Sequence, residues 1–229
     1  MANFFKFIAI IIGICSVTVS IIYGNSETVF VKPFFHVFLY LYYWRKTGDL
    51  NVMLLSALVF AMLGEACVAL GMTRLFYPAM FLFTLYFISF TFLLRPVLRK
   101  TNFSIRSRDL TAPFIGFIAI TYIIITISSL VVDHIPSIYI YTPAFLSFVL
   151  FITVCFYVSI FNRHPKSVFL FIAGAGYTVV ALGTFIFEYL EDSTALMGVI
   201  NGCEFIAQLL FVQYLINMKK VIRESDSYF

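Results

Sequence analysis

Eight apolar stretches follow one another along this chain, separated by short segments rich in polar and turn-forming residues. A helix needs about 20 apolar residues to cross a bilayer. Because lipid offers the backbone no hydrogen-bonding partner, such stretches form helices, and they are too long and continuous for barrel strands. The sequence therefore predicts a polytopic, all-α transmembrane bundle that forms one domain over residues 1–229. We place its eight spans at residues 4–23, 29–44, 51–71, 76–98, 112–132, 137–161, 167–189 and 195–217.

Composition excludes the main soluble classes. Hydrophobic residues make up 62% of the chain and charged residues 11%, whereas soluble domains average roughly 45–50% and 25%. Too few polar side chains remain to cover a water-facing surface, which excludes a soluble fold, a disordered chain and a basic nucleic-acid-binding domain. We expect a multi-pass protein of the cell membrane, the inner membrane in a bacterium. Its partners should be membrane lipids and not nucleic acid, and its oligomeric state stays open.

The basic residues predict the orientation of the spans. The stretch at 29–44 is the weakest because it is short and contains Lys32 and His36. If it is counted and the N-terminus is cytoplasmic, every Lys and Arg except Lys32 and Arg74 falls on the cytoplasmic side. This is the distribution that the positive-inside rule describes, and an odd number of spans would scramble it. We therefore expect eight spans with both termini in the cytoplasm. The outer loops then hold acidic residues: Glu27, Asp133, Glu188, Glu191 and Asp192.

The two halves of the chain share a short sequence pattern. Residues 64–71 are GEACVALG, and residues 176–183, four spans later, are GYTVVALG. A displacement of four spans preserves orientation, so the pattern predicts a parallel 4+4 repeat about an axis along the membrane normal. Chance similarity among small apolar residues is the alternative. A true repeat would place Glu65 and Tyr177 at equivalent depths on opposite sides of a central cavity.

Two acidic residues, Glu65 and Glu204, lie inside predicted spans. A charged side chain at the bilayer centre costs on the order of 2.5–3.5 kcal/mol on insertion scales. Both are therefore expected to face the interior of the bundle. The four cysteines are singly spaced, and no metal-binding or nucleotide-binding motif occurs. We accordingly expect no metal and no cofactor.

Polar residues near these acids recur at helical spacing. Lys32 and His36 are four residues apart and share one stripe of a helix, as do Asn201, Glu204 and Gln208. At about 1.5 Å per residue, Lys32, His36, Glu65 and Glu204 lie in the outer half of the bilayer. We expect them to converge on one cavity there. The alternative is that they only hold helices together through interhelical hydrogen bonds.

The motifs around these residues resemble the YhhN family, which is related to lysoplasmalogenases. That family is an eight-span bundle with a Lys-Pro in span two, a Gly-Asp in span three, a Ser-Asp in span seven and an Ala-Gln in span eight. Lys32-Pro33 and Ala207-Gln208 match as they stand, and Gly64-Glu65 matches with glutamate in place of aspartate. Gly176-Tyr177 stands where Ser-Asp is expected, so the second acid of the family pattern is missing.

The resemblance implies hydrolysis of the vinyl ether bond of lysoplasmalogens to an aldehyde and a glycerophospho head group. This chemistry requires an acid that protonates the outer alkene carbon, and a carboxylate that stabilises the resulting cation and directs water. On this hypothesis Glu65 is the acid, and Glu204 replaces the missing aspartate. Lys32 would hold the lipid phosphate, His36 and Tyr177 would orient water, and Asn201 and Gln208 would contact substrate.

Two other functions stay open at this point. The loss of one family carboxylate is compatible with a non-enzymatic protein that binds a lipid or small molecule, or acts as a sensor. A proton-coupled transporter would use Glu65, Glu204 and His36 as a proton relay.

Overall fold

A computed structural model describes residues 2–100, 122, 125–126, 129, 134–162, 164–190 and 193–224. Within these residues the regular structure is entirely helical, so the all-α prediction is confirmed. The predicted span at 112–132 falls almost entirely outside the described residues. A 3₁₀ helix, η1 (Asn25–Phe30), joins the first two α-helices. The α-helices are α1 (Ala2–Ile22), α2 (Lys32–Thr47), α3 (Val52–Ala69), α4 (Phe76–Leu98), α6 (Ile138–Phe161), α7 (Ser167–Tyr189) and α8 (Thr194–Glu224).

Six of these helices, α1, α3, α4, α6, α7 and α8, are long and apolar enough to cross a membrane. The chain is therefore an integral membrane protein. The weak stretch at 29–44 corresponds to α2, which has only 16 residues and carries Arg45 and Lys46 in its last turn. It also begins later than predicted, because η1 takes up residues 25–30. Pro33 lies in the first turn of α2, where its missing N–H removes no helical hydrogen bond.

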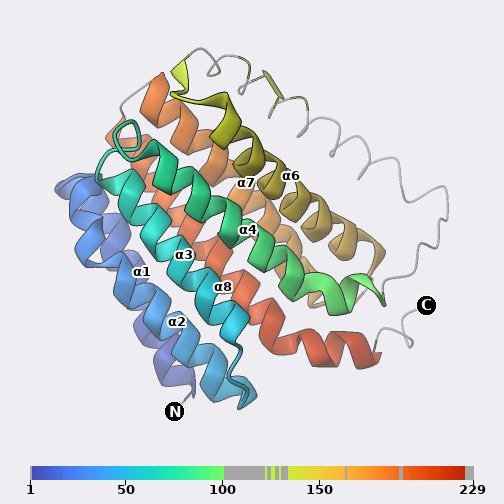
Figure 1. Ribbon diagram of the computed structural model, residues 1–229. Coiled ribbons are helices and arrows are strands. Elements are labelled where there is room, and N and C mark those ends of the chain that lie inside the picture. The colour runs from blue at the N-terminus through green and yellow to red at the C-terminus, as the bar shows by residue number, and fades with distance from the viewer. Residues whose placement is uncertain are drawn as a thin grey trace.

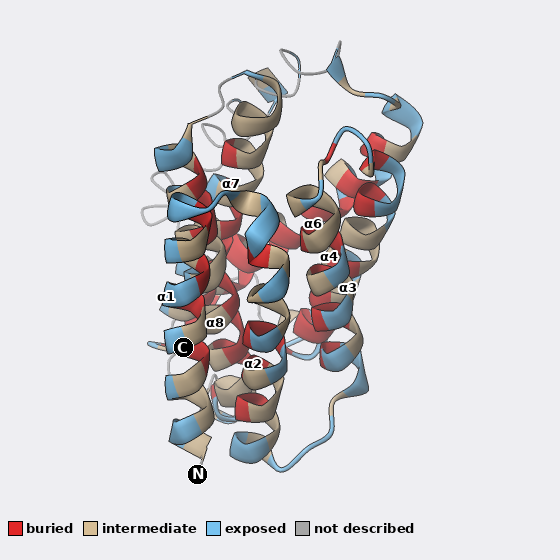
Figure 2. Cartoon of the chain, turned by 90° about the vertical axis from the view of Figure 1, so that its left-hand side faces the viewer, coloured by how far each residue is buried: buried red, intermediate tan, exposed pale blue. Residues whose placement is uncertain are grey.

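The helices form a bundle in which α1 to α4 alternate in direction, as do α6 to α8, whereas α4 and α6 run the same way (Figure 1). Helix α8 packs against α1, α2, α4 and α7, so the last helix touches both the beginning and the middle of the chain. The start of α1 and the end of α8 lie at the same end of the bundle (Figure 1). Buried residues concentrate on the inward faces of the helices, and exposed ones on the periphery (Figure 2).

The connection between α2 and α3 shows how the sequence sets these helix ends. Gly48 has a φ of 74°, a left-handed conformation that glycine adopts without steric penalty, and its N–H donates to the Trp44 carbonyl. Asn51 then caps α3, because its side-chain oxygen accepts a hydrogen bond from the Leu54 N–H at 3.0 Å. The two caps reverse the chain within a few residues and fix where α3 begins.

Close approach of α7 and α8 depends on small residues. A Cβ atom added to Gly176 would lie 2.9 Å from the Cβ atom of Ala207 and 3.3 Å from the Cys203 carbonyl oxygen. Small residues at such crossings let helix backbones approach within membranes. This contact places Tyr177 and Gln208, the next residues on each helix, inside the bundle, where both are buried.

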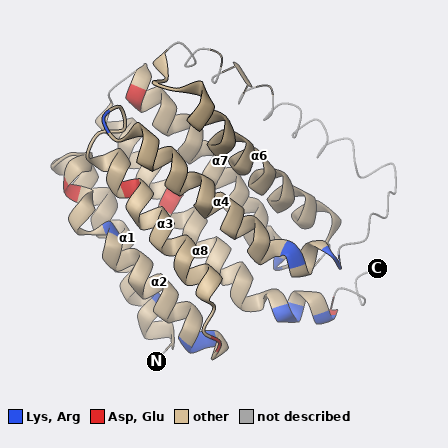
Figure 3. Ribbon diagram, in the orientation of Figure 1, with Lys and Arg blue, Asp and Glu red and all other residues tan. Residues whose placement is uncertain are grey.

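Charged residues divide between the two ends of the bundle. Lys and Arg gather at the end where α2, α4 and α8 terminate (Figure 3). The opposite end contains the η1 connection with Glu27. Glu65 and Glu204 lie within α3 and α8, and they belong to the candidate site.

Candidate functional site

Lys32 joins two acidic side chains from different helices. Its Nζ atom donates a hydrogen bond to Oε2 of Glu204 at 2.6 Å and lies 3.7 Å from Oε2 of Glu65. Lys32 begins α2, while Glu65 comes from the last turns of α3 and Glu204 from the first half of α8. One cation therefore connects three helices and brings the two acids to the same place in the bundle.

Glu65 has two further partners. His36 lies one turn after Lys32 on α2, and its Nε2 atom is 3.2 Å from Oε1 of Glu65. The side-chain amide of Gln208 on α8 donates to the same oxygen at 2.7 Å. His36, Glu65 and Gln208 are all buried, with 5% or less of each residue exposed. We call Lys32, His36, Glu65, Glu204 and Gln208 the ionic cluster.

The hydrogen bonds of His36 determine where its protons lie. The backbone carbonyl of Lys32 can only accept, so Nδ1 of His36, 2.9 Å away, carries a hydrogen and donates it. In a neutral ring Nε2 would then be an acceptor. Because Nε2 faces an oxygen of Glu65, either Glu65 donates a proton to the ring or a doubly protonated ring donates to the carboxylate. Both arrangements hold one proton between His36 and Glu65.

With this proton the ionic cluster carries no net charge. The His36–Glu65 pair is neutral overall, and the Lys32 ammonium balances the Glu204 carboxylate. Isolated charges are costly in an apolar interior, whereas paired and hydrogen-bonded charges are tolerated. The arrangement explains how two acids and a lysine persist at mid-depth in an apolar bundle.

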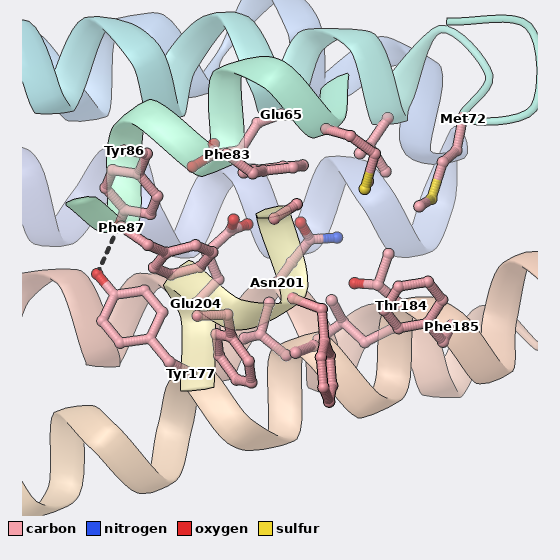
Figure 4. Close-up of a pocket in the computed structure, with 18 of the residues that line it drawn as sticks. Glu65, Met72, Phe83, Tyr86, Phe87, Tyr177, Thr184, Phe185, Asn201 and Glu204 are labelled. Atoms are coloured by element: carbon pink, nitrogen blue, oxygen red, sulfur yellow. Dashed lines mark hydrogen bonds between the residues drawn. The ribbon is translucent and has the colours of Figure 1, made fainter. Parts of the chain in front are cut away.

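The ionic cluster borders a cavity of about 130 Å³. Glu65, Glu204 and Asn201 point into it (Figure 4). Its apolar wall comes mainly from α4, α6 and α7 and includes Phe83, Phe87, Phe145, Phe148, Val180 and Phe185. The cavity also reaches Met72 and Asn25, at the end of the bundle opposite the basic residues. We call it the large cavity.

Tyr177 also lines the large cavity, but its hydroxyl group contacts Tyr86 and not the acids. The two hydroxyl oxygens are 2.7 Å apart, and both residues are buried (Figure 4). Asn201 donates from its side-chain amide to the Met197 carbonyl at 3.1 Å and makes no hydrogen bond to the ionic cluster. The structure thus brings Lys32, His36, Glu65, Glu204 and Gln208 into direct contact and leaves Tyr177 and Asn201 as neighbours in the cavity wall.

Sequence reasoning missed the residues that shape the cavity. Tyr86 lies in the middle of the predicted span 76–98, but it is one of many aromatic residues there, and the sequence does not show which of them face the interior. The phenylalanines of the wall likewise look the same in the sequence as lipid-facing ones. The hydrogen bond between the hydroxyl groups of Tyr86 and Tyr177 shows that these two tyrosines face the interior. This contact is visible only in the three-dimensional structure.

The donor set of the site is not that of a metal centre. Within the described part of the chain, no three His, Cys, Asp or Glu side chains are grouped so that they could hold a metal ion. The free cysteines of this part lie apart from one another on α1, α3, α6 and α8.

Comparison with known proteins adds no family: neither protein-family models, nor curated proteins, nor solved structures match this chain.

Proposed function

We propose that this protein is a YhhN-like membrane hydrolase that cleaves the vinyl ether bond of lysoplasmalogen-type lipids in the cell membrane. The observation that carries the proposal is the His36–Glu65 pair, which holds a proton at the wall of an apolar cavity, beside a second acid, Glu204. Vinyl ether hydrolysis needs a proton donor, an anionic group and an apolar binding site, and these three features occur together here.

The proposal includes eight spans with both termini in the cytoplasm. Helix α2, which packs along α1 and α3, and residues 112–132 would supply the two spans beyond the six apolar helices. The basic end of the bundle would face the cytoplasm, as the positive-inside rule expects. A 4+4 repeat is supported by the pairing of α3 with α4 and of α7 with α8, and by Glu65 and Tyr177 lining one cavity.

The large cavity suits a lipid with a single chain. Its apolar wall would take the start of the alkenyl chain, and its extension toward Met72 and Asn25 would lead to the outer surface, where such a lipid enters. Lys32 is already bonded to Glu204, so a phosphate could bind Lys32 only by competing with this acid. Holding Glu204 is the role that the contacts of Lys32 favour.

The reaction would proceed by protonation followed by addition of water. Glu65, supplied from His36, transfers the proton to the outer alkene carbon, which leaves an oxocarbenium ion. The carboxylate of Glu204, fixed by Lys32, stabilises this cation and accepts a proton from the attacking water. The resulting hemiacetal separates into an aldehyde and an alcohol, and the proton taken from water replaces the one used at the start. Glu204 thus takes the place of the acid that is missing at Tyr177.

A proton-coupled transporter is the second candidate. The proton held between His36 and Glu65, together with Glu204, is the kind of intramembrane relay that transporters use. A transporter would release no aldehyde, and the flux of its solute across vesicle membranes would depend on a pH gradient.

Purified protein in lipid nanodiscs, supplied with a lysoplasmalogen, tests the proposal. Aldehyde release is expected from the native protein, and Glu65→Gln and Glu204→Gln should each lower it by about 10²–10⁴-fold, as loss of an acid–base group does. Glu27→Gln, an exposed acid in the η1 connection, is the control and should keep full activity. A lysolipid with a saturated ether bond should remain intact. Full activity of Glu65→Gln would overturn the assignment.

A further inference from the structure

A second, smaller cavity borders the ionic cluster on the side of α1. Lys32, Glu65, Asn201 and Glu204 line both cavities. The remaining walls differ: the large cavity is closed by α4, α6 and α7, whereas Gly13 and Ser16 of α1, Phe35 of α2, and Phe205 and Gln208 of α8 close the small one. The ionic cluster therefore separates two chambers of different size.

Two polar atoms at the wall of the small cavity hydrogen-bond to no described residue. These are the hydroxyl oxygen Oγ of Ser16 and the amide oxygen Oε1 of Gln208. Ser16 is 5% exposed and Gln208 1% exposed, so bulk solvent does not reach them. A buried polar atom without a partner is destabilising, and the buried waters of folded proteins typically bond to such atoms.

The size of the small cavity points to the same ligand. Its volume is about 10 Å³, about that of one water molecule by the measure that counts probe-filled space. A buried water usually makes two to four hydrogen bonds. Ser16 and Gln208 supply two partners, and the charged groups of Lys32 and Glu204 border the same space.

We propose that the small cavity is a binding site for one ordered water molecule, held by Ser16 and Gln208 next to the carboxyl groups of Glu65 and Glu204. Ser16 thereby becomes a positioning residue on α1, a helix that contributes no residue to the ionic cluster. If the proposed hydrolysis is correct, this water is the reserve from which the attacking molecule comes, because it adjoins both acids without occupying the space of the lipid.

Water-edited solid-state NMR in lipid bilayers tests the site with water itself as the probe. In the native protein, magnetisation from water should reach the side chains of Ser16 and Gln208 rapidly. Ser16→Val removes the hydroxyl and fills the space, so transfer to Gln208 should fall severalfold. Ser20→Val is the matched control: Ser20 lies one turn further along α1, is also buried, and donates to the Val17 carbonyl at 2.8 Å. It should leave transfer to Gln208 unchanged.

Two results would overturn the water site: no transfer to Gln208 in the native protein, or equal transfer in Ser16→Val and Ser20→Val. If Ser16→Val does not fold, Ser16→Ala removes the hydroxyl without adding bulk and should still weaken the transfer. Aldehyde release measured on the same samples separates this proposal from the proposed function. Magnetisation transfer to Gln208 in the native protein without aldehyde release supports the water site alone. Aldehyde release without this transfer supports the hydrolase alone.

Discussion

His36 and Glu65 face each other across 3.2 Å, Nε2 to Oε1, while the other ring nitrogen of His36 donates to a backbone carbonyl. That carbonyl can only accept, so Nδ1 carries a hydrogen. A second hydrogen must then lie between Nε2 and Glu65, on one atom or the other. The pair consequently holds one proton, and the hydrogen bond within a single turn of α2 fixes its position.

Replacement of His36 by Gln should lower vinyl ether hydrolysis by about 10²-fold or more, since Gln can donate a hydrogen bond to Glu65 but cannot carry a proton. Substrate binding should change little, because His36 does not line the large cavity. Steady-state aldehyde release in nanodiscs separates the two effects. Loss of affinity with an unchanged turnover number would contradict a role in proton supply.

Lys32→Met should destabilise the protein by about 3–5 kcal/mol, because Glu204 would remain buried without its cation. Combining it with Glu204→Gln should restore part of this loss, since the uncompensated charge is gone. Unfolding in detergent, followed by circular dichroism, measures both. Lys219→Met is the control, since Lys219 pairs with Asp49 at an exposed end, with 82% of its side chain accessible, and should leave the midpoint unchanged.

Tyr177→Phe should have a mild effect on catalysis, despite the position of Tyr177 in the cavity wall. Its hydroxyl group bonds to Tyr86, so its removal leaves the buried Tyr86 hydroxyl without this partner, which costs about 1–3 kcal/mol of stability. Tyr86→Phe should cost a similar amount, and the double variant should cost less than the sum of the two. A double-mutant cycle on unfolding provides this comparison. A large loss of turnover in Tyr177→Phe alone would instead give its hydroxyl a direct catalytic role.

Gly176→Ala should destabilise the bundle by about 1–3 kcal/mol, because the new methyl group meets Ala207 on α8 at 2.9 Å. Gly202→Ala on α8 offers a matched comparison, since a Cβ atom there meets nothing within 4 Å. This second change should be neutral or stabilising, as alanine favours helix more than glycine does. Thermal unfolding of the two variants distinguishes a steric contact from a general effect of glycine replacement.

Cysteine accessibility should establish the proposed orientation. In a background without the native cysteines, Ser26→Cys in η1 should react with a membrane-impermeant maleimide added to intact cells. Asp49→Cys, in the connection between α2 and α3, should react only after the membrane is opened. Both positions are exposed in the bundle, so burial does not explain a difference. The reverse pattern of labelling would place the basic end outside.

The sequence predicted the helical class and most helix positions because apolar length and turn residues are local signals. It placed α2 less well, since η1 and the charged ends of that helix interrupt the apolar pattern. Helical spacing put Lys32 and His36 on one face, but the partners of Glu65 come from α2 and α8, which are distant in sequence. Whether Lys32 and His36 pair with Glu65 or with Glu204 depends on the rotation and tilt of the helices. A single sequence does not encode these in a local pattern.

The bond between Lys32 and Glu204 also affects how the protein is made. Helix α2 is short and begins with a cation whose closest counter-charge lies on α8, which is synthesised after the other described helices. Before α8 is inserted, the start of α2 can lie at the level of the lipid headgroups, where the Lys32 ammonium stays hydrated. We therefore expect α2 to reach its final depth only after α8 has been synthesised and Glu204 can pair with Lys32.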